Sequence, residues 1–243
     1  MCEYQEVFRR YEKKYLLKEQ TYRLLAERLQ GRFVPDEYGE STVCNIYFDT
    51  PDNRLVRTSI EGPVYKEKLR LRSYGVPRQD GTVFVEMKKK YRGIVYKRRA
   101  DMTLEAAEQF LYKGTPPDSL NQIGREILWS TRYYSGLRPA MYLCCDRTAL
   151  VGADDPNLRI TFDSRLLWRQ SALHLEEGAW GIPLLPAGTR LMEIKIPDAM
   201  PVWLADILDG MKLYPTSFSK YGAAYRAARH GKGRKESGVV CCA

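Results

Sequence analysis

The segment "YKEKLRLRSYG", residues 65–75, constrains the fold of this chain more than any other stretch. In an extended strand, successive side chains point to opposite faces. Four cations therefore share one face of the predicted strand: Lys66, Lys68, Arg70 and Arg72. Neighbouring cations lie about 7 Å apart, and each pair repels by about 2 kcal/mol where water cannot screen it. Leu69 and Leu71 lie on the other face. The fold must therefore bury one face of this strand and stabilise a row of positive charge on the other.

The same alternation recurs along the chain. Residues 65–99 contain twelve Lys or Arg against three acidic residues. Glu86 and Lys88 share a face of one predicted strand, and Glu193 and Lys195 share a face of another. On a single strand, this pattern is typical of an antiparallel sheet with one face in water. Taken together, the charged faces carry cations with one recurring carboxylate, instead of the mixed charges of a solvated surface.

A closed antiparallel barrel meets both demands, because helices can bury its outer face while its lumen stays charged and wet. Strands are predicted at residues 8–17, 42–52, 65–75, 82–102 (two strands broken near Gly93), 140–152, 158–169 and 189–197. Helices are predicted at residues 19–31, 103–114, 119–136, 201–215 and 217–229. We therefore predict an α+β fold, an eight-stranded antiparallel β-barrel flanked by helices. It forms one domain over residues 1–230, followed by a flexible C-terminal tail over residues 231–243.

The charge of the predicted lumen calls for an anion. The chain carries a formal net charge of +9, and repulsion across a cationic lumen would be prohibitive without a counter-ion. A triphosphate or phosphate chain offers many acceptor oxygens to guanidinium forks and ammonium groups. The occasional carboxylate suits a divalent cation that bridges phosphates. We interpret the row of cations as one wall of a phosphate site.

Other chemistries have weaker signals in the sequence. It contains no Walker-type glycine loop, no G-x-S-x-G motif and no histidine pair with metal-ligand spacing. We interpret His174 as an incidental loop residue and the six cysteines as reduced thiols. The apolar runs are too short for a membrane span. Seventeen tyrosines leave nucleic-acid binding through base stacking as a weaker alternative.

A series of short motifs in a fixed order resembles a known family: "RRYEKKYLL", "NIYFDTPD", "KLRLRSYG", "VFVEMKKK", "CDRTAL", "LRITFD", "LMEIKIP" and "SFSKYGAAY". From about residue 7 to residue 228, the chain resembles the catalytic VTC (vacuolar transporter chaperone) domain of polyphosphate polymerases, within the triphosphate tunnel metalloenzyme superfamily. The resemblance implies an eight-stranded tunnel with a basic lumen. It also implies transfer of the terminal phosphate of ATP onto a growing polyphosphate chain, with Mn²⁺ or Mg²⁺ as cofactor.

The resemblance assigns roles to individual residues. It implies that Lys14, Glu193 and Lys220 are catalytic and that Glu193 binds the metal. On the terminal helix, Lys220 would neutralise charge on the transferring phosphoryl group. The row of cations and the resemblance together predict these phosphate-binding residues: Lys14, Lys68, Arg70, Arg72, Lys88, Lys97, Arg147, Arg159, Lys195, Ser219 and Lys220.

Two departures from the family pattern bear on activity. The E-x-E-x-K motif of the wider superfamily is replaced by Arg10-x-Glu12-x-Lys14, which argues against a hydrolase-type two-metal arrangement. Ser217 stands where yeast-like polymerases have a second basic residue. The alternatives are a triphosphatase or polyphosphatase of the same fold, or a non-catalytic polyphosphate-binding module. We expect ATP and inorganic polyphosphate or triphosphate as partners, with no nucleic acid and no membrane segment, in the bacterial cytoplasm.

Overall fold

The structure is a computed structural model that describes residues 11–92, 94–197 and 199–236. The strands are β1 (Tyr11–Lys18), β2 (Phe33–Asp49), β3 (Tyr65–Tyr74), β4 (Thr82–Tyr91), β5 (Ile94–Thr103), β6 (Arg138–Gly152), β7 (Arg159–Arg169), β8 (Ile182–Pro183) and β9 (Thr189–Ile196). The helices are α1 (Glu19–Arg28), α2 (Arg54–Glu61), α3 (Leu104–Tyr112), α4 (Gln122–Tyr133), α5 (Val202–Gly210) and α6 (Lys220–Glu236). No described helix is both long and apolar enough to span a bilayer.

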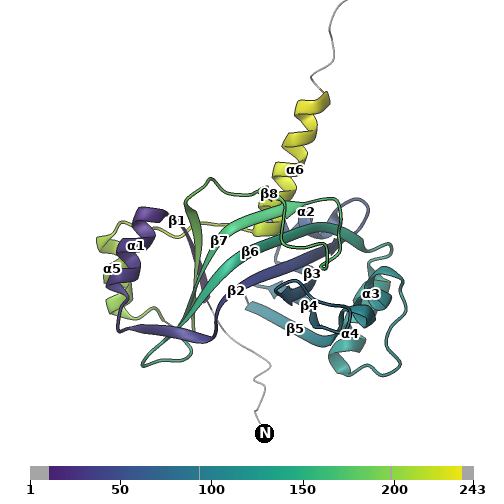
Figure 1. The fold of residues 1–243 in the computed structure, drawn as a ribbon, viewed down its shortest axis with the longest axis horizontal. Coiled ribbons are helices and arrows are strands. Elements are labelled where there is room, and N and C mark those ends of the chain that lie inside the picture. The colour runs from purple at the N-terminus through teal and green to yellow at the C-terminus, as the bar shows by residue number, and fades with distance from the viewer. Residues whose placement is uncertain (1–10, 93, 198, 237–243) are drawn as a thin grey trace, which may run out of the picture.

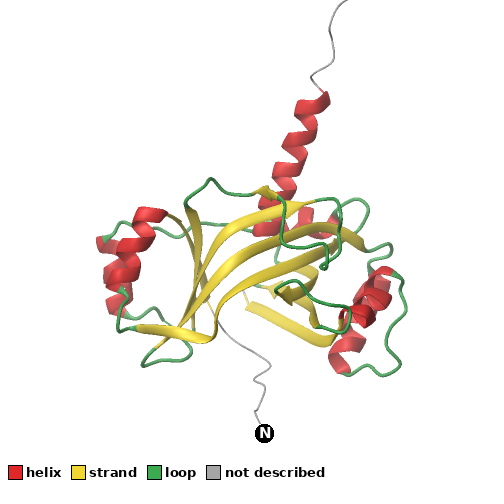
Figure 2. Ribbon diagram, viewed as in Figure 1, coloured by secondary structure: helices red, strands yellow, loops and turns green. Residues whose placement is uncertain are grey.

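The strands form one curved antiparallel sheet (Figure 2). Its order is β1-β9-β7-β6-β2-β3-β4-β5, with the two-residue β8 paired to β7. The predicted α+β architecture with eight principal strands is confirmed. The sheet is barrel-like, but among the described residues no backbone ladder joins its end strands β1 and β5. A wide, cation-lined mouth opens between these two strands.

The alternation predicted from the sequence determines which faces the helices cover. Leu69 and Leu71 of β3 are buried on the outer face, in an apolar cluster with Phe110 of α3 and Ile127 of α4. Near the other end of the strand order, on the same outer face, a second cluster buries strands β1, β7 and β9 under α1 and α5 (Figure 1). The opposite, charged face of the sheet lines the lumen.

The start of α6 packs against the lumen side of the sheet, and its later turns project away from it (Figure 1). Tyr221 stacks on Tyr47 of β2, with ring centroids 4.5 Å apart. Asp49, which is fully buried, accepts a hydrogen bond from the Tyr221 hydroxyl at 2.8 Å. The same carboxylate accepts the backbone N–H groups of Leu55 and Val56 and thereby caps α2. One buried Asp therefore connects β2, α2 and α6.

Several element boundaries differ from those predicted. The sequence did not predict α2, because its cap lies upstream at Asp49 and its Ncap residue Asn53 makes no side-chain cap. Strand β2 begins at Phe33 because it continues beyond a bulge to pair with β6. Helix α6 begins at Lys220 rather than residue 217 and runs to Glu236, into the predicted tail. Residues 8–10, Gly93 and the rest of that tail (237–243) lie outside the described residues.

Candidate active site

The lumen-facing side chains enclose two adjoining cavities. An inner cavity of about 200 Å³ lies among β2, β3, β6, β9 and the start of α6. A mouth of about 630 Å³ opens beside it, between β1, the ends of β3 to β5, and residues 216–219. Lys14, Lys68, Lys88 and Ser219 line both cavities. The two cavities therefore form one continuous basic passage.

The sequence predicts twelve catalytic or phosphate-binding residues, and eleven of them line the inner cavity: Lys14, Lys68, Arg70, Arg72, Lys88, Lys97, Arg147, Glu193, Lys195, Ser219 and Lys220. Arg159 differs. It is the first residue of β7, and its guanidinium pairs with Asp36 in the bulged part of β2 at 2.7 Å. Eleven predicted residues thus lie together, and their roles in binding stay predictions.

Strands β2 and β3 orient the arginine pair of the lumen. Arg72 donates to the side-chain oxygen of Asn45 at 2.8 Å, and Arg70 donates to the Tyr47 hydroxyl at 3.2 Å. Burial alone would raise the pKa of Tyr47, but nearby cations, Arg70 foremost, lower it to about 8. Asn45 and Tyr47 were not predicted as site residues, although their spacing of two along β2 places them on the lumen face.

The first turn of α6 brings two predicted residues into the lumen. Ser219 caps the helix, because its hydroxyl accepts the backbone N–H of Gly222 at 3.2 Å. The same hydroxyl accepts a hydrogen bond from Lys68 at 2.9 Å. Lys220 then extends its ammonium to Asp163 and, at 3.4 Å, to Glu193. The positive end of the helix dipole and the Lys220 charge therefore reinforce each other in the lumen.

Asp163 of β7 is an anchor that the sequence prediction missed. It is fully buried and forms a bidentate pair with Arg147, with N–O distances of 2.7 and 2.8 Å. Burial by itself would raise the pKa of Asp163, but Lys220 and Arg147 hold it below its ordinary value. Strand alternation does place Asp163 on the lumen face. Its partners come from β6 and α6, so their identity depends on tertiary structure.

Glu193 of β9 is the predicted metal ligand. It lies on the cavity surface, with 13% of its side chain exposed, and contacts the ammonium groups of Lys14 and Lys220 at 3.4 Å each. Burial would raise the pKa of Glu193, but these cations hold it well below its usual range. An ionised carboxylate that faces a phosphate site fits a hard divalent cation, which binds through one or two carboxylates plus phosphate oxygens and water. The residues present are therefore suitable for Mg²⁺ or Mn²⁺.

Two lysines in the lumen differ from the other cations. Among the described residues, no carboxylate lies within ion-pair distance of Lys68 or Lys195. Burial foremost, together with a neighbouring cation, lowers the pKa of each ammonium to about 8; the cation is Lys14 at Lys68 and Arg147 at Lys195. Both groups would gain from a bound anion, which supports a phosphate site here.

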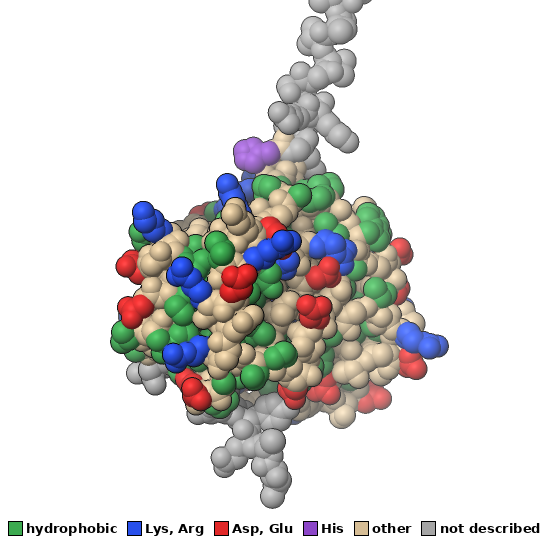
Figure 3. Space-filling view, turned by 60° about the vertical axis from the view of Figure 1, so that its left-hand side comes forward, with side chains coloured by type: hydrophobic (Ala, Val, Ile, Leu, Met, Phe, Trp, Pro, Cys, Tyr) green, Lys and Arg blue, Asp and Glu red, His purple; other side chains and the backbone are tan. Residues whose placement is uncertain are grey.

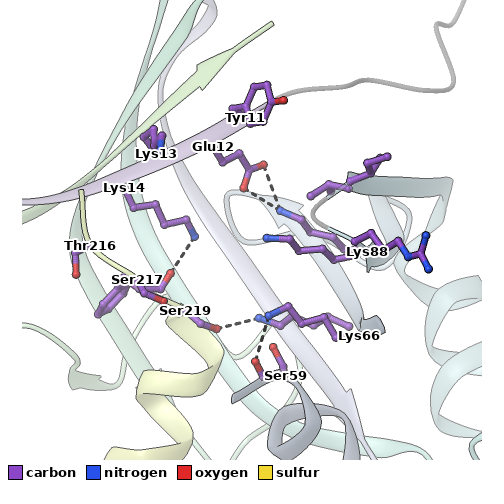
Figure 4. A pocket seen from close by; sticks show the side chains of 16 residues that line it. Tyr11, Glu12, Lys13, Lys14, Ser59, Lys66, Lys88, Thr216, Ser217 and Ser219 are labelled. Atoms are coloured by element: carbon purple, nitrogen blue, oxygen red, sulfur yellow. Dashed lines mark hydrogen bonds and ion pairs between the residues drawn. The ribbon is translucent and has the colours of Figure 1, made fainter. Parts of the chain in front are cut away.

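The mouth carries its own ion pair (Figure 4). Glu12 of β1 contacts the Lys88 ammonium of β4 at 3.1 Å and so bridges the mouth between the two ends of the sheet. Lys14 donates to the backbone carbonyl of Phe218 at 3.0 Å. Glu12 is thus occupied by a lysine, and Arg10 lies outside the described residues. Among its described residues, β1 therefore presents one carboxylate at the mouth.

A separate cluster of possible metal ligands lies outside the tunnel. Glu108 of α3, His174 and Glu176 bring their ligand atoms within 4.8 Å of one another. His174 and Glu176 are exposed, and the His174 ring lies 2.8 Å from Glu108. His174 therefore pairs with a neighbouring carboxylate on the surface and does not reach the lumen site.

Comparison with known families identifies the domain. The family model described as "VTC domain" matches residues 9–229. This chain belongs to the VTC domain family. The predicted membership is therefore confirmed over nearly the whole chain. No curated protein matches the sequence.

Solved structures with the fold of this VTC domain come from distant proteins. A candidate adenylate cyclase from Bacillus halodurans superposes with a TM-score of 0.57 at 15% identity, covering 88% of this chain and 94% of that one. A candidate adenylate cyclase from Vibrio parahaemolyticus gives 0.52 at 13% identity, covering 91% and 99%. A candidate adenylyl cyclase from Hippeastrum, described as having a dominant triphosphatase activity, gives 0.52 at 15% identity, covering 89% and 95%. The shared fold is that of the triphosphate tunnel metalloenzymes.

Proposed function

We propose that this VTC domain is a polyphosphate polymerase that uses ATP and inorganic polyphosphate in the bacterial cytoplasm. One observation carries the proposal. Lys220 from a helix terminus and Glu193 from the opposite wall meet at 3.4 Å inside a passage lined by cations from the mouth inward. A passage of this kind suits a linear polyanion. A compact anion would need only part of it.

In the proposed reaction, a terminal oxygen of the polyphosphate chain attacks the γ-phosphorus of ATP. The bond from this phosphorus to the β-phosphate oxygen breaks, ADP leaves with the electron pair, and the chain grows by one phosphate. Arg70, Arg72 and Arg147 would bind and orient the phosphates through their guanidinium forks. Lys220 would stabilise the charge on the transferring group. A Mn²⁺ or Mg²⁺ ion held by Glu193 would neutralise charge on the phosphate oxygens.

A triphosphatase is the second candidate. It is supported by the Hippeastrum protein, whose fold is similar and whose described activity is that of a triphosphatase. In this reaction, water would replace the polyphosphate chain as the nucleophile. Against it, position 10 is arginine, so the first strand offers one carboxylate, Glu12, where the E-x-E-x-K motif has two. A binding module that stores polyphosphate is the third candidate.

The products formed from ATP distinguish these functions. The purified protein is incubated with ATP and Mn²⁺, polyphosphate is resolved on a gel, and free phosphate is measured in the same samples. A ladder of chains with little free phosphate is expected. Free phosphate without a ladder would indicate the triphosphatase. Neither product, together with tight binding of triphosphate, would indicate the binding module.

A further inference from the structure

Glu86 of β4 is a buried carboxylate that lies within ion-pair distance of four cations. It is 1% exposed. Arg70 and Arg99 each approach it to 2.6 Å, Lys97 lies at 2.9 Å and Arg72 at 3.7 Å. Three of these cations, Arg70, Arg72 and Lys97, line the inner cavity, whereas Glu86 and Arg99 are outside its lining. A ligand in the passage would touch the cations and would not touch Glu86.

The charge on Glu86 is permanent. Burial by itself would raise its pKa, but Arg70 and the other three cations hold the pKa well below its usual range. The carboxylate therefore stays ionised at any physiological pH. It offsets one of the four positive charges and leaves the other three for an anion in the passage.

Glu86 also determines the orientation of the cations that it contacts. Arg70 places its Nε and Nη2 groups on one oxygen, and Arg99 places its Nε and Nη2 groups on the other. These are the fork contacts through which a guanidinium would otherwise bind phosphate. A phosphate chain must therefore share Arg70 with Glu86, which limits how tightly the wall can hold the chain.

We propose that Glu86 is a positioning residue that weakens the hold of the tunnel on phosphate so that a chain can advance. The inference rests on the proposed polymerase function, because each transfer requires the chain to move by one phosphate. A passage with no internal counter-charge would bind the polyanion more tightly and release it more slowly. Glu86 would therefore keep the affinity for the polyphosphate chain high enough for binding and low enough for movement along the passage.

The main test replaces Glu86 and measures triphosphate affinity without metal, by calorimetry at a fixed salt concentration. Glu86→Gln removes the charge but keeps the shape, so triphosphate should bind about tenfold more tightly or better. Turnover should slow as release becomes limiting. Glu86→Asp keeps the charge and should restore affinity toward that of the parent. A residue with a merely structural role would weaken binding when replaced, so the direction of the change is decisive.

The matched control is Glu67→Gln. Glu67 is also buried in the sheet, on β3, but it faces outward, where it accepts from Tyr65 and lies 3.7 Å from Lys89. The substitution changes the net charge by the same amount without changing the lumen wall. Its triphosphate affinity should stay within about twofold of the parent.

A second variant tests the same idea in the opposite direction and remains available if Glu86→Gln does not fold. Arg99→Gln removes a cation that contacts Glu86 but does not line the inner cavity. Glu86 would then hold the three lining cations more strongly, and triphosphate should bind several-fold more weakly. The control is Arg98→Gln, the neighbouring residue on the outer face of β5, which pairs with Glu126 at 3.1 Å. Its affinity should stay near that of the parent.

The outcomes separate this inference from the proposed function. Tighter binding of triphosphate to Glu86→Gln supports the role of Glu86. Weaker binding to Arg99→Gln, with unchanged binding to its control Arg98→Gln, supports it as well. A parent protein that binds triphosphate, with a folded Glu86→Gln that binds no more tightly, overturns the inference alone. If Glu86→Gln does not fold, equal affinity in Arg99→Gln and Arg98→Gln overturns it. A parent protein that binds no triphosphate overturns the proposed function and the inference together.

Discussion

At the scale of single residues, Glu193 has two tasks that one substitution can separate. Its carboxylate contacts the Lys14 and Lys220 ammonium groups and faces the lumen, where a metal would bind. Glu193→Gln keeps the shape and removes the charge. Turnover with ATP and Mn²⁺ should fall by about 10²-fold or more, while metal-free triphosphate binding should persist or tighten. Assays of turnover and calorimetry on the same preparation check both. Unchanged turnover would remove Glu193 from the chemistry.

Lys220 should act mainly on the transition state, because its ammonium lies at the helix terminus where the transferring group is expected. Lys220→Ala should lower kcat by about 10²-fold, with a smaller effect on the Kd for triphosphate. Asp163 keeps its bidentate contact with Arg147 in this variant, so the fold should survive. Arg229→Ala, an exposed position on the same helix, is the control and should keep full turnover. Equal loss of kcat and affinity would instead indicate that Lys220 only binds.

Lys68 and Lys195, which have no carboxylate partner among the residues that the structure describes, predict the pH dependence. In the fold, burial lowers the pKa of Lys68 and Lys195 from the usual 10.5 to about 8. Triphosphate affinity should therefore fall about tenfold between pH 7 and pH 9, as the ammonium groups lose their protons. Calorimetry at both values measures this, and Lys68→Met should flatten the profile. Equal affinity at pH 7 and pH 9 in the parent would contradict the assignment.

The same shifts predict the sign of the stability change for the empty protein. Between pH 8 and 10.5, the unfolded chain binds more protons at Lys68 and Lys195 than the folded chain. Stability should therefore rise with pH across this window, because a cost of buried charge is removed. At pH 7 both states are protonated and the full cost is present. Thermal unfolding at pH 7 and 9 measures this change, with Lys68→Met for comparison. Stability that falls from pH 7 to pH 9 in the parent would contradict the assignment.

Most residues of the candidate site were predictable, because strand alternation needs only the local sequence. Arg70, Arg72 and Lys195 lie on the lumen face for that reason. Arg159 follows the same rule, but a bulge in β2 brings Asp36 to its guanidinium. The roles of Asp163 and Glu86 were not predictable, because each carboxylate is defined by partners from other elements. Which cation meets which carboxylate depends on cross-strand register and on the docking of α6.

At the scale of elements, the docking of α6 through Tyr221 controls where Ser219 and Lys220 lie. The Tyr221 hydroxyl donates to the buried Asp49 at 2.8 Å. Tyr221→Phe removes this charged hydrogen bond and should lower the free energy of unfolding by about 1.5–3 kcal/mol. Tyr221→Phe should also reduce kcat, because the start of α6 would be docked less firmly and the neighbouring Lys220 would be positioned less well. Tyr225→Phe, further along α6 with its hydroxyl near Arg229, is the control. The measurement is urea unfolding of the parent, Tyr221→Phe and Tyr225→Phe. Equal free energies of unfolding in the parent and Tyr221→Phe would contradict this account of the docking.

Local sequence signals predicted the types of most elements, helix or strand, more accurately than they predicted where the elements begin and end. The helix predicted at 103–114 is α3, and Thr103 caps it by accepting the Ala106 N–H. Helix α2 escaped prediction because Asp49, four residues before the Ncap position, satisfies its first N–H groups. The full length of β2 was not predicted either. Its first residues form a strand only because they pair with β6 on the far side of a bulge.

At the scale of the whole molecule, the excess positive charge is concentrated in the lumen. The chain carries a net charge of +9, yet Figure 3 shows a face on which Lys and Arg lie scattered among Asp and Glu. Eleven predicted site residues line the inner cavity, and nine of them are Lys or Arg. The barrel-like architecture was predictable from the sequence, because the cations share one face of each strand and that face had to point inward. The lack of a ladder between β1 and β5 in the described part of the chain was not predicted, because lumen width depends on how all strands twist together.

The central claim is that the row of cations on β3 is one wall of a phosphate-chain site. The most direct test is a crystal structure of the protein with triphosphate and Mn²⁺ bound. We predict phosphate oxygens within hydrogen-bond distance of Arg70, Arg72 and Arg147, with the metal on the Glu193 carboxylate and Lys220 facing the terminal phosphate. Triphosphate bound at an outer surface, with the inner cavity empty at saturating ligand, would contradict the account.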